Sequence, residues 1–148
     1  MKSERKTILV PVDFEGASKR AIDAARWLAA ALEADIVLVH AHDRPGFEHP
    51  ELPGDMITRI EGLVEQAGQR SLTDLASEVG ASRSIFRHGD PAVCILEVAA
   101  EIKAAMIVMG THGRRGLDRF LMGSVAAQVV RRSPVPVVTV RASTDDEA

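Results

Sequence analysis

Three glycines and a serine at fixed spacing form the most informative chemical pattern in this sequence. Two residues separate Gly110 from Gly113, and nine more precede the pair Gly123 and Ser124. A glycine beside a helix start lets an anion approach the first backbone N–H groups, which have no partner within the helix. The Ser124 hydroxyl would add another donor. The pattern therefore indicates a phosphate-binding loop.

The same stretch carries two arginines, Arg114 and Arg115, which can give charge-assisted hydrogen bonds to a polyphosphate. The sequence contains neither G-x-G-x-x-G nor G-x-x-x-x-G-K-[ST], so it has no dinucleotide fingerprint and no Walker loop. The alternative is structural: the glycines would only permit tight turns, and Ser124 would only be a helix N-cap. Residue types and spacing leave both interpretations open.

The elements that would position this loop alternate along the chain. Strand patterns, apolar and rich in β-branched residues, lie at 7–12, 35–41, 104–109 and 136–140, with a less apolar, edge-type pattern at 82–87. Helical stripes lie at 18–32, where Ser18 would be the cap, and at 55–79, 91–102 and 124–132. This order predicts a doubly wound α/β domain with a parallel sheet and helices on both faces. Ligands bind such sheets at the carboxyl ends of the strands, where the strand order reverses.

Composition excludes several classes of function. The chain has 148 residues, which predicts one domain over 1–148 with a frayed tail at 142–148. A net charge of −3, four Phe, one Trp and no Tyr disfavour nucleic-acid binding. The single cysteine cannot form an internal disulfide, and the apolar run Ile8–Val12 is too short for a signal peptide or a membrane span. We therefore expect a cytoplasmic protein that binds no membrane.

Taken together, these features resemble the universal stress proteins of the nucleotide-binding type. The family motif is Gly, two residues, Gly, nine residues, Gly and then Ser or Thr, which Gly110, Gly113, Gly123 and Ser124 match without a gap. The likeness extends to ILVPVDF, LVHAHD and MGTHGRRGLDRFLMGSVAAQVVRRSPVPVVTV, and so spans nearly the whole chain. The resemblance implies a five-stranded parallel sheet of order 3-2-1-4-5 that binds ATP between strands one and four.

The resemblance also implies which residues bind the nucleotide. In order from adenosine through ribose to phosphates, these are Pro11, Val12, Asp13 and Ala41, then Met109 and Gly110, then Gly113, Arg114, Gly123, Ser124 and Val125. The Asp13 carboxylate can accept from an exocyclic amine or a ribose hydroxyl, or it is a capping or turn residue. A divalent ion, Mg²⁺ or Mn²⁺, would be carried on the phosphates. Glu15 stands where many members have Ser or Thr, and its charge is expected to weaken triphosphate binding.

For the histidines and the cysteine, the sequence indicates structural rather than chemical roles where it indicates any. His40 and His42 lie on one face of a strand, but no third metal ligand stands at a recognisable spacing, so we expect packing and loop hydrogen bonds. His112 lies inside the motif and has no assigned role. Cys94 lies among apolar residues of a helix and is expected in the core.

The sequence leaves three functions open. The first is an ATP-binding stress-response sensor or adaptor with an unknown protein partner. The second is a slow ATPase or an autophosphorylating phosphotransferase that uses Ser124; no nucleophile and base pair is visible, so hydrolysis is expected to be incidental. The third is a nucleotide-free dimeric interaction module. For the dimer, antiparallel pairing of the apolar C-terminal strand Val137–Val140 is expected, as in family members.

Overall fold

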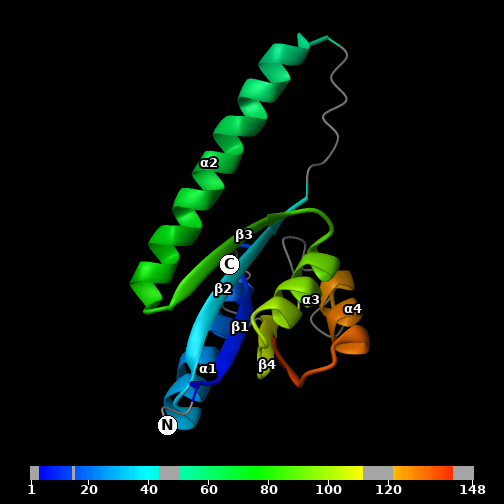
Figure 1. Cartoon of the computed structure of the whole chain (residues 1–148). Helices are drawn as coiled ribbons and strands as arrows, with labels where there is room; N and C mark the ends of the chain where they lie inside the picture. The colour runs from blue at the N-terminus through cyan, green and yellow to red at the C-terminus, as the bar shows by residue number, and fades with distance from the viewer. Residues whose placement is uncertain (1–3, 15, 44–50, 112–121, 142–148) are drawn as a thin grey trace.

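Strands and helices alternate along the chain as the sequence predicts. The computed structural model describes residues 4–14, 16–43, 51–111 and 122–141 (Figure 1). In this part the strands are β1 (Thr7–Pro11), β2 (Asp35–His42), β3 (Arg83–His88), β4 (Met106–Gly110) and β5 (Val137–Val140). The helices are α1 (Gly16–Leu32), α2 (Gly54–Val79), α3 (Pro91–Glu101) and α4 (Ser124–Arg132). Each element begins and ends within about two residues of its expected bounds.

All strand pairs are parallel, and the order β3-β2-β1-β4-β5 confirms the doubly wound sheet. β1 pairs with β2 along its whole length, from Thr7↔Asp35 to Pro11↔Val39. Its register with β4 is Ile8↔Met106 and Leu9↔Ile107, near the start of both strands. The strand order reverses between β1 and β4, so the ends of these two strands mark the place where ligands bind such sheets.

Two hydrophobic cores lie on opposite faces of the sheet. Alternate residues of β1 divide between them, because successive side chains of a strand point to opposite faces. Ile8, Val10 and Val12 pack with α1 and α2, whereas Leu9 packs with α3 and α4. The central strands are thus covered on both sides, which explains their continuous apolar sequences.

Helix α2 is long, and only its second half packs on the sheet. Leu72 and Ala76 are its buried residues, and Figure 1 shows its first half extending beyond the carboxyl ends of β2 and β3. A Cβ built on Gly68 would lie 3.1 Å from Phe86 Cε2, so the missing side chain lets α2 approach β3. Gly80 ends the helix at φ +74°, a left-handed conformation suited to glycine. Neither α2 nor another helix in the described ranges is long and apolar enough to cross a membrane.

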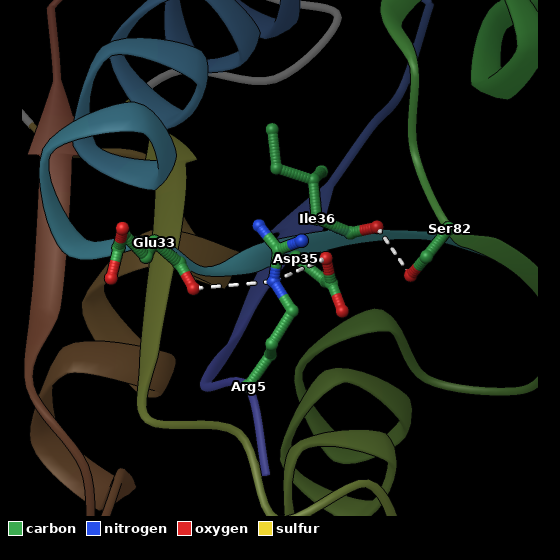
Figure 2. Close-up of polar contacts among 5 residues, drawn as sticks. All are labelled: Arg5, Glu33, Asp35, Ile36 and Ser82. Carbon is green, nitrogen blue, oxygen red and sulfur yellow. Dashed lines mark hydrogen bonds and ion pairs between the residues drawn. The ribbon is translucent and has the colours of Figure 1, made fainter. Parts of the chain in front are cut away.

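Polar contacts tie the elements together at the amino ends of the strands (Figure 2). Arg5 Nε donates to the Glu33 backbone oxygen at 3.3 Å and lies 3.3 Å from Asp35 Oδ1. The Ser82 hydroxyl donates to the Ile36 backbone oxygen at 3.1 Å. These contacts join the starts of β1, β2 and β3 at the edge of the sheet opposite the candidate site.

Candidate functional site

Hydrogen bonds anchor the start of α4 beside the end of β4. The Gly123 N–H donates to the backbone oxygen of Thr111 at 2.6 Å, and the Thr111 N–H donates to that of Val140 at 3.0 Å. Thr111 directly follows β4 and is buried. The first turn of α4 is therefore held at the carboxyl edge of the sheet, next to the strand-order reversal.

Gly123 is the N-cap of α4, and its conformation does not require a glycine. Its φ of −60° and ψ of 159° are open to any residue, so a tight turn does not explain it. Ser124 is the first helical residue rather than the N-cap, and it is exposed. The Ser124 and Val125 amides have no partner within the helix, because the first N–H groups lack one by geometry. Such a helix start can hold an anion, with the dipole adding about 0.3–1 kcal/mol.

The end of β1 presents Asp13, which one hydroxyl group holds in place. Ser18 Oγ donates to Asp13 Oδ1 at 2.6 Å and accepts from the Asp13 backbone N–H at 3.0 Å. The expectation that Ser18 is the N-cap is wrong, because α1 already begins at Gly16. The hydroxyl is used instead to fix the backbone and the carboxylate of a candidate site residue.

His40 supports the residue before Asp13 from the neighbouring strand. Its Nδ1 donates to the Val12 backbone oxygen at 2.7 Å, and the Val12 N–H donates to the Val39 oxygen at 2.8 Å. The His40 ring also lies 4.8 Å from that of Phe14, whose φ of 66° is rare for a residue with a side chain. No sequence pattern indicated this support, since it depends on the parallel register of β1 and β2.

The structure brings most of the expected site residues to one edge of the sheet. The residues that lie at the ends of β1 and β4 and at the start of α4 are Pro11, Val12, Asp13, Met109, Gly110, Gly123, Ser124 and Val125. Ala41 lies in β2, half-buried, two positions beyond the residue that pairs with Pro11. Val12 and Met109 have core side chains, so they can offer a ligand only their backbone groups. The expected residues Gly113 and Arg114 lie outside the described residues, as do Arg115, His112 and Glu15.

Two further histidines, His42 and His88, pack where β2 and β3 end. The His42 ring lies 5.9 Å from both Phe86 and His88, and His88 Nε2 lies 2.9 Å from Glu65 Oε1 on α2. These contacts confirm the packing roles expected for His40 and His42. In the part of the chain that the structure describes, no three His, Cys, Asp or Glu side chains are grouped to hold a metal ion.

Cys94 belongs to the core, as expected from the sequence. It is 5% exposed, and its Sγ donates to the His88 backbone oxygen at 3.5 Å. Burial raises the pKa of the Cys94 thiol, and the charge of Glu97 adds to this effect. The thiol therefore stays protonated at neutral pH, which lowers its reactivity.

The sequence profile of the universal stress protein family matches residues 4–141. This chain belongs to that family. Universal stress protein MJ0531 of Methanocaldococcus jannaschii is 33% identical over 140 residues, which cover 92% of this chain and 82% of the relative. Universal stress protein YxiE of Bacillus subtilis is 31% identical over 144 residues, covering 90% and 97%.

Solved structures agree with the fold of this universal stress protein. The hypothetical protein MJ0577 superposes with a TM-score of 0.78 at 24% identity, covering 93% of this chain and 96% of that chain. A universal stress protein solved in complex with cAMP gives a TM-score of 0.64 at 30% identity, covering 95% and 100%. The first comparison shows the shared fold, and the second is with a family member that binds a cyclic nucleotide.

Proposed function

We propose that this universal stress protein binds ATP between the ends of β1 and β4 and acts as a nucleotide-dependent stress-response sensor or adaptor. The observation that carries the proposal is Gly123, a glycine that the backbone does not require at the start of a helix anchored to the sheet edge. The relative in complex with cAMP supports an adenine nucleotide as the ligand class. The single cysteine, which leaves no internal disulfide, fits the reducing cytoplasm as its compartment.

Each part of the nucleotide would meet a different element. The Asp13 carboxylate, oriented by Ser18, would accept from the exocyclic amine or a ribose hydroxyl. Neighbouring contacts to adenosine and ribose would come from Pro11, Val12, Ala41, Met109 and Gly110. The phosphates would lie at the start of α4, where the missing side chain of Gly123 leaves room beside the amides of Ser124 and Val125, and Gly113 and Arg114 would complete the contacts. Mg²⁺ or Mn²⁺ carried by the phosphates would neutralise part of their charge.

Calorimetric titration with ATP and Mg²⁺ tests the site. We expect a dissociation constant of roughly micromolar order, and competition by cAMP would show that both ligands use one pocket. Gly123→Val should lower the affinity roughly tenfold or more, because its side chain would occupy the place of a phosphoryl oxygen. Its unfolding free energy should change little, because valine can adopt the same φ and ψ.

Gly54→Val is the matched control, since it places the same side chain at another helix start where a Cβ meets nothing within 4 Å. This variant should bind ATP like the wild type. Intact protein that bound no ATP, or a Gly123→Val variant with unchanged affinity, would reject the proposed site.

The alternative function is phosphotransfer that uses Ser124. We consider it because the Ser124 side chain is exposed at the start of α4. Phosphate release or protein labelling from γ-labelled ATP would measure it. Turnover well above a blank that disappears in Ser124→Ala would replace the binding role by an enzymatic one. ATP binding without turnover would support the sensor or adaptor.

We further propose that two copies pair through β5, the outer strand of the sheet. Pro136 and Val140 accept hydrogen bonds from the β4 side, from Ile107 and Thr111. Because backbone direction alternates along a strand, Val137 and Thr139 turn their N–H and C=O groups to the open edge. Antiparallel pairing of two such edges would form the two-fold dimer.

A further inference from the structure

The first half of α2 exposes an apolar stripe, which we call the α2 seam. It consists of Met56, Ile60, Leu63, Val64 and Ala67, all classed as exposed. Leu63 is 66% exposed, and Met56 and Val64 are 46% and 45% exposed. Large apolar side chains gathered on one face of a projecting helix are typical of an interaction surface rather than of scattered surface residues.

The seam points away from the residues that attach α2 to the sheet. That attachment runs through Glu65, Gly68, Leu72 and Ala76. At about 100° per residue, the centre of the seam lies roughly two-fifths of a turn from this line. Within the described ranges the seam is left uncovered.

The spacing of the seam makes it complementary to itself. Met56, Ile60, Leu63 and Ala67 follow steps of four, three and four residues, the spacing of a coiled-coil seam. Two copies of α2 placed antiparallel about the midpoint between Ile60 and Leu63 set Ile60 of one copy against Leu63 of the other. The same pairing sets Met56 against Ala67, a large residue against a small one, so all four layers are apolar.

The charges beside the seam fit the same pairing. Asp55 comes within about 3 Å, measured along the helix axis, of the level of Arg70 in the second copy. Neither Asp55 nor Arg70 makes an ion pair in the part of the chain that is described. On the same side of the seam, Arg59 comes equally close to the level of Gln66 of the second copy. The two-fold axis repeats each contact, so the pairing opposes no like charges at these positions.

We propose that the α2 seam is a self-association surface, on which α2 of a second copy packs antiparallel. The occupant is this chain itself, because both the apolar layers and the Asp55–Arg70 charges complement their own copies. A seam of about three turns buries less than the roughly 800 Å² per partner of a standard stable interface. The association is therefore weak, concentration-dependent and separate from both the β5 edge and the nucleotide site.

Sedimentation equilibrium of the full chain from about 10 to several hundred micromolar tests the proposal. The series is also measured in a Thr139→Pro background, which removes an outward N–H of β5 and isolates the seam. Leu63→Glu should lower the association constant by about 100-fold or more, because two charges enter the apolar layers. Ser77→Glu is the matched control: it adds the same charge to an exposed position in the second half of α2 and should associate like the wild type.

Exchanging the charges of Asp55 and Arg70 distinguishes this antiparallel pairing from nonspecific hydrophobic association. Asp55→Arg should weaken association roughly tenfold, because the symmetry places two arginine pairs in contact. Asp55→Arg combined with Arg70→Asp should restore it. A wild type of constant mass over the whole range, with Leu63→Glu indistinguishable from it, would overturn the proposal, as would failure of the double variant to recover.

Discussion

Ser18 shows how one small side chain can organise a site from outside it. Its hydroxyl joins the backbone and the carboxylate of Asp13, and its side chain is buried, so water cannot readily replace either bond. His40 does the same for the backbone oxygen of Val12. Neither residue was expected to bind the nucleotide, yet both position residues that were.

Removing the Ser18 hydroxyl tests this arrangement. Ser18→Ala should lower the unfolding free energy by about 1–2 kcal/mol, because it leaves a half-buried carboxylate and an N–H without that partner. It should also weaken ATP binding, because the Asp13 carboxylate is no longer fixed. Urea unfolding and calorimetry measure the two effects. Ser71→Ala, at an exposed position of α2, is the control, and equal behaviour of the two variants would contradict the role given to Ser18.

Helix α2 shows that a helical pattern can predict apolar positions without predicting what packs against them. The sequence predicted one apolar stripe from Met56 to Val79 along this helix. The structure buries that stripe only in the second half, at Leu72 and Ala76, and leaves the first half exposed. The two halves of α2 therefore use different faces, one for a core contact and the other for the surface that we propose for self-association.

Two glycines inside α2, Gly62 and Gly68, and Gly80 at its C-cap should respond differently to the same substitution. Gly62→Ala should raise the unfolding free energy by about 0.5–1 kcal/mol, because alanine is the better helix former and meets no neighbour. Gly80→Ala should lower it by about 1 kcal/mol, because the residue has a φ of +74°. Gly68→Ala should not raise the unfolding free energy in this way, because its Cβ would press on the Phe86 ring. Urea unfolding of the three variants measures this order, and a stabilised Gly80→Ala would contradict it.

The two self-association surfaces that we propose lie on different parts of the protein. The β5 edge offers backbone groups, whereas the α2 seam offers side chains from a projecting helix. Each would pair about its own two-fold axis, so the two contacts together can build assemblies larger than a dimer.

The β5 contact can be removed without breaking the sheet. Thr139→Pro deletes an N–H that faces the open edge, while the bonds that link β5 to β4 remain at Pro136 and Val140. At low micromolar concentration, light scattering should show the dimer mass for the wild type and the monomer mass of 15.9 kDa for the variant. Thr139→Val keeps the N–H and should stay dimeric. A dimeric Thr139→Pro protein would show that β5 is not the contact.

Periodicity along the chain was enough to predict the order of the elements, their bounds to about two residues and the class of sheet, because buried strands and amphipathic helices have different periodicities. The glycine spacing indicated a phosphate-binding loop before Ser124. The family resemblance supplied the strand order, which the structure confirms, and ATP, which stays a prediction. Only the folded protein shows that Ser18 and His40 support Asp13 and Val12, and that the apolar residues in the first half of α2 are exposed. Such contacts depend on which elements become neighbours, and periodicity shows which face is apolar without showing what packs against it.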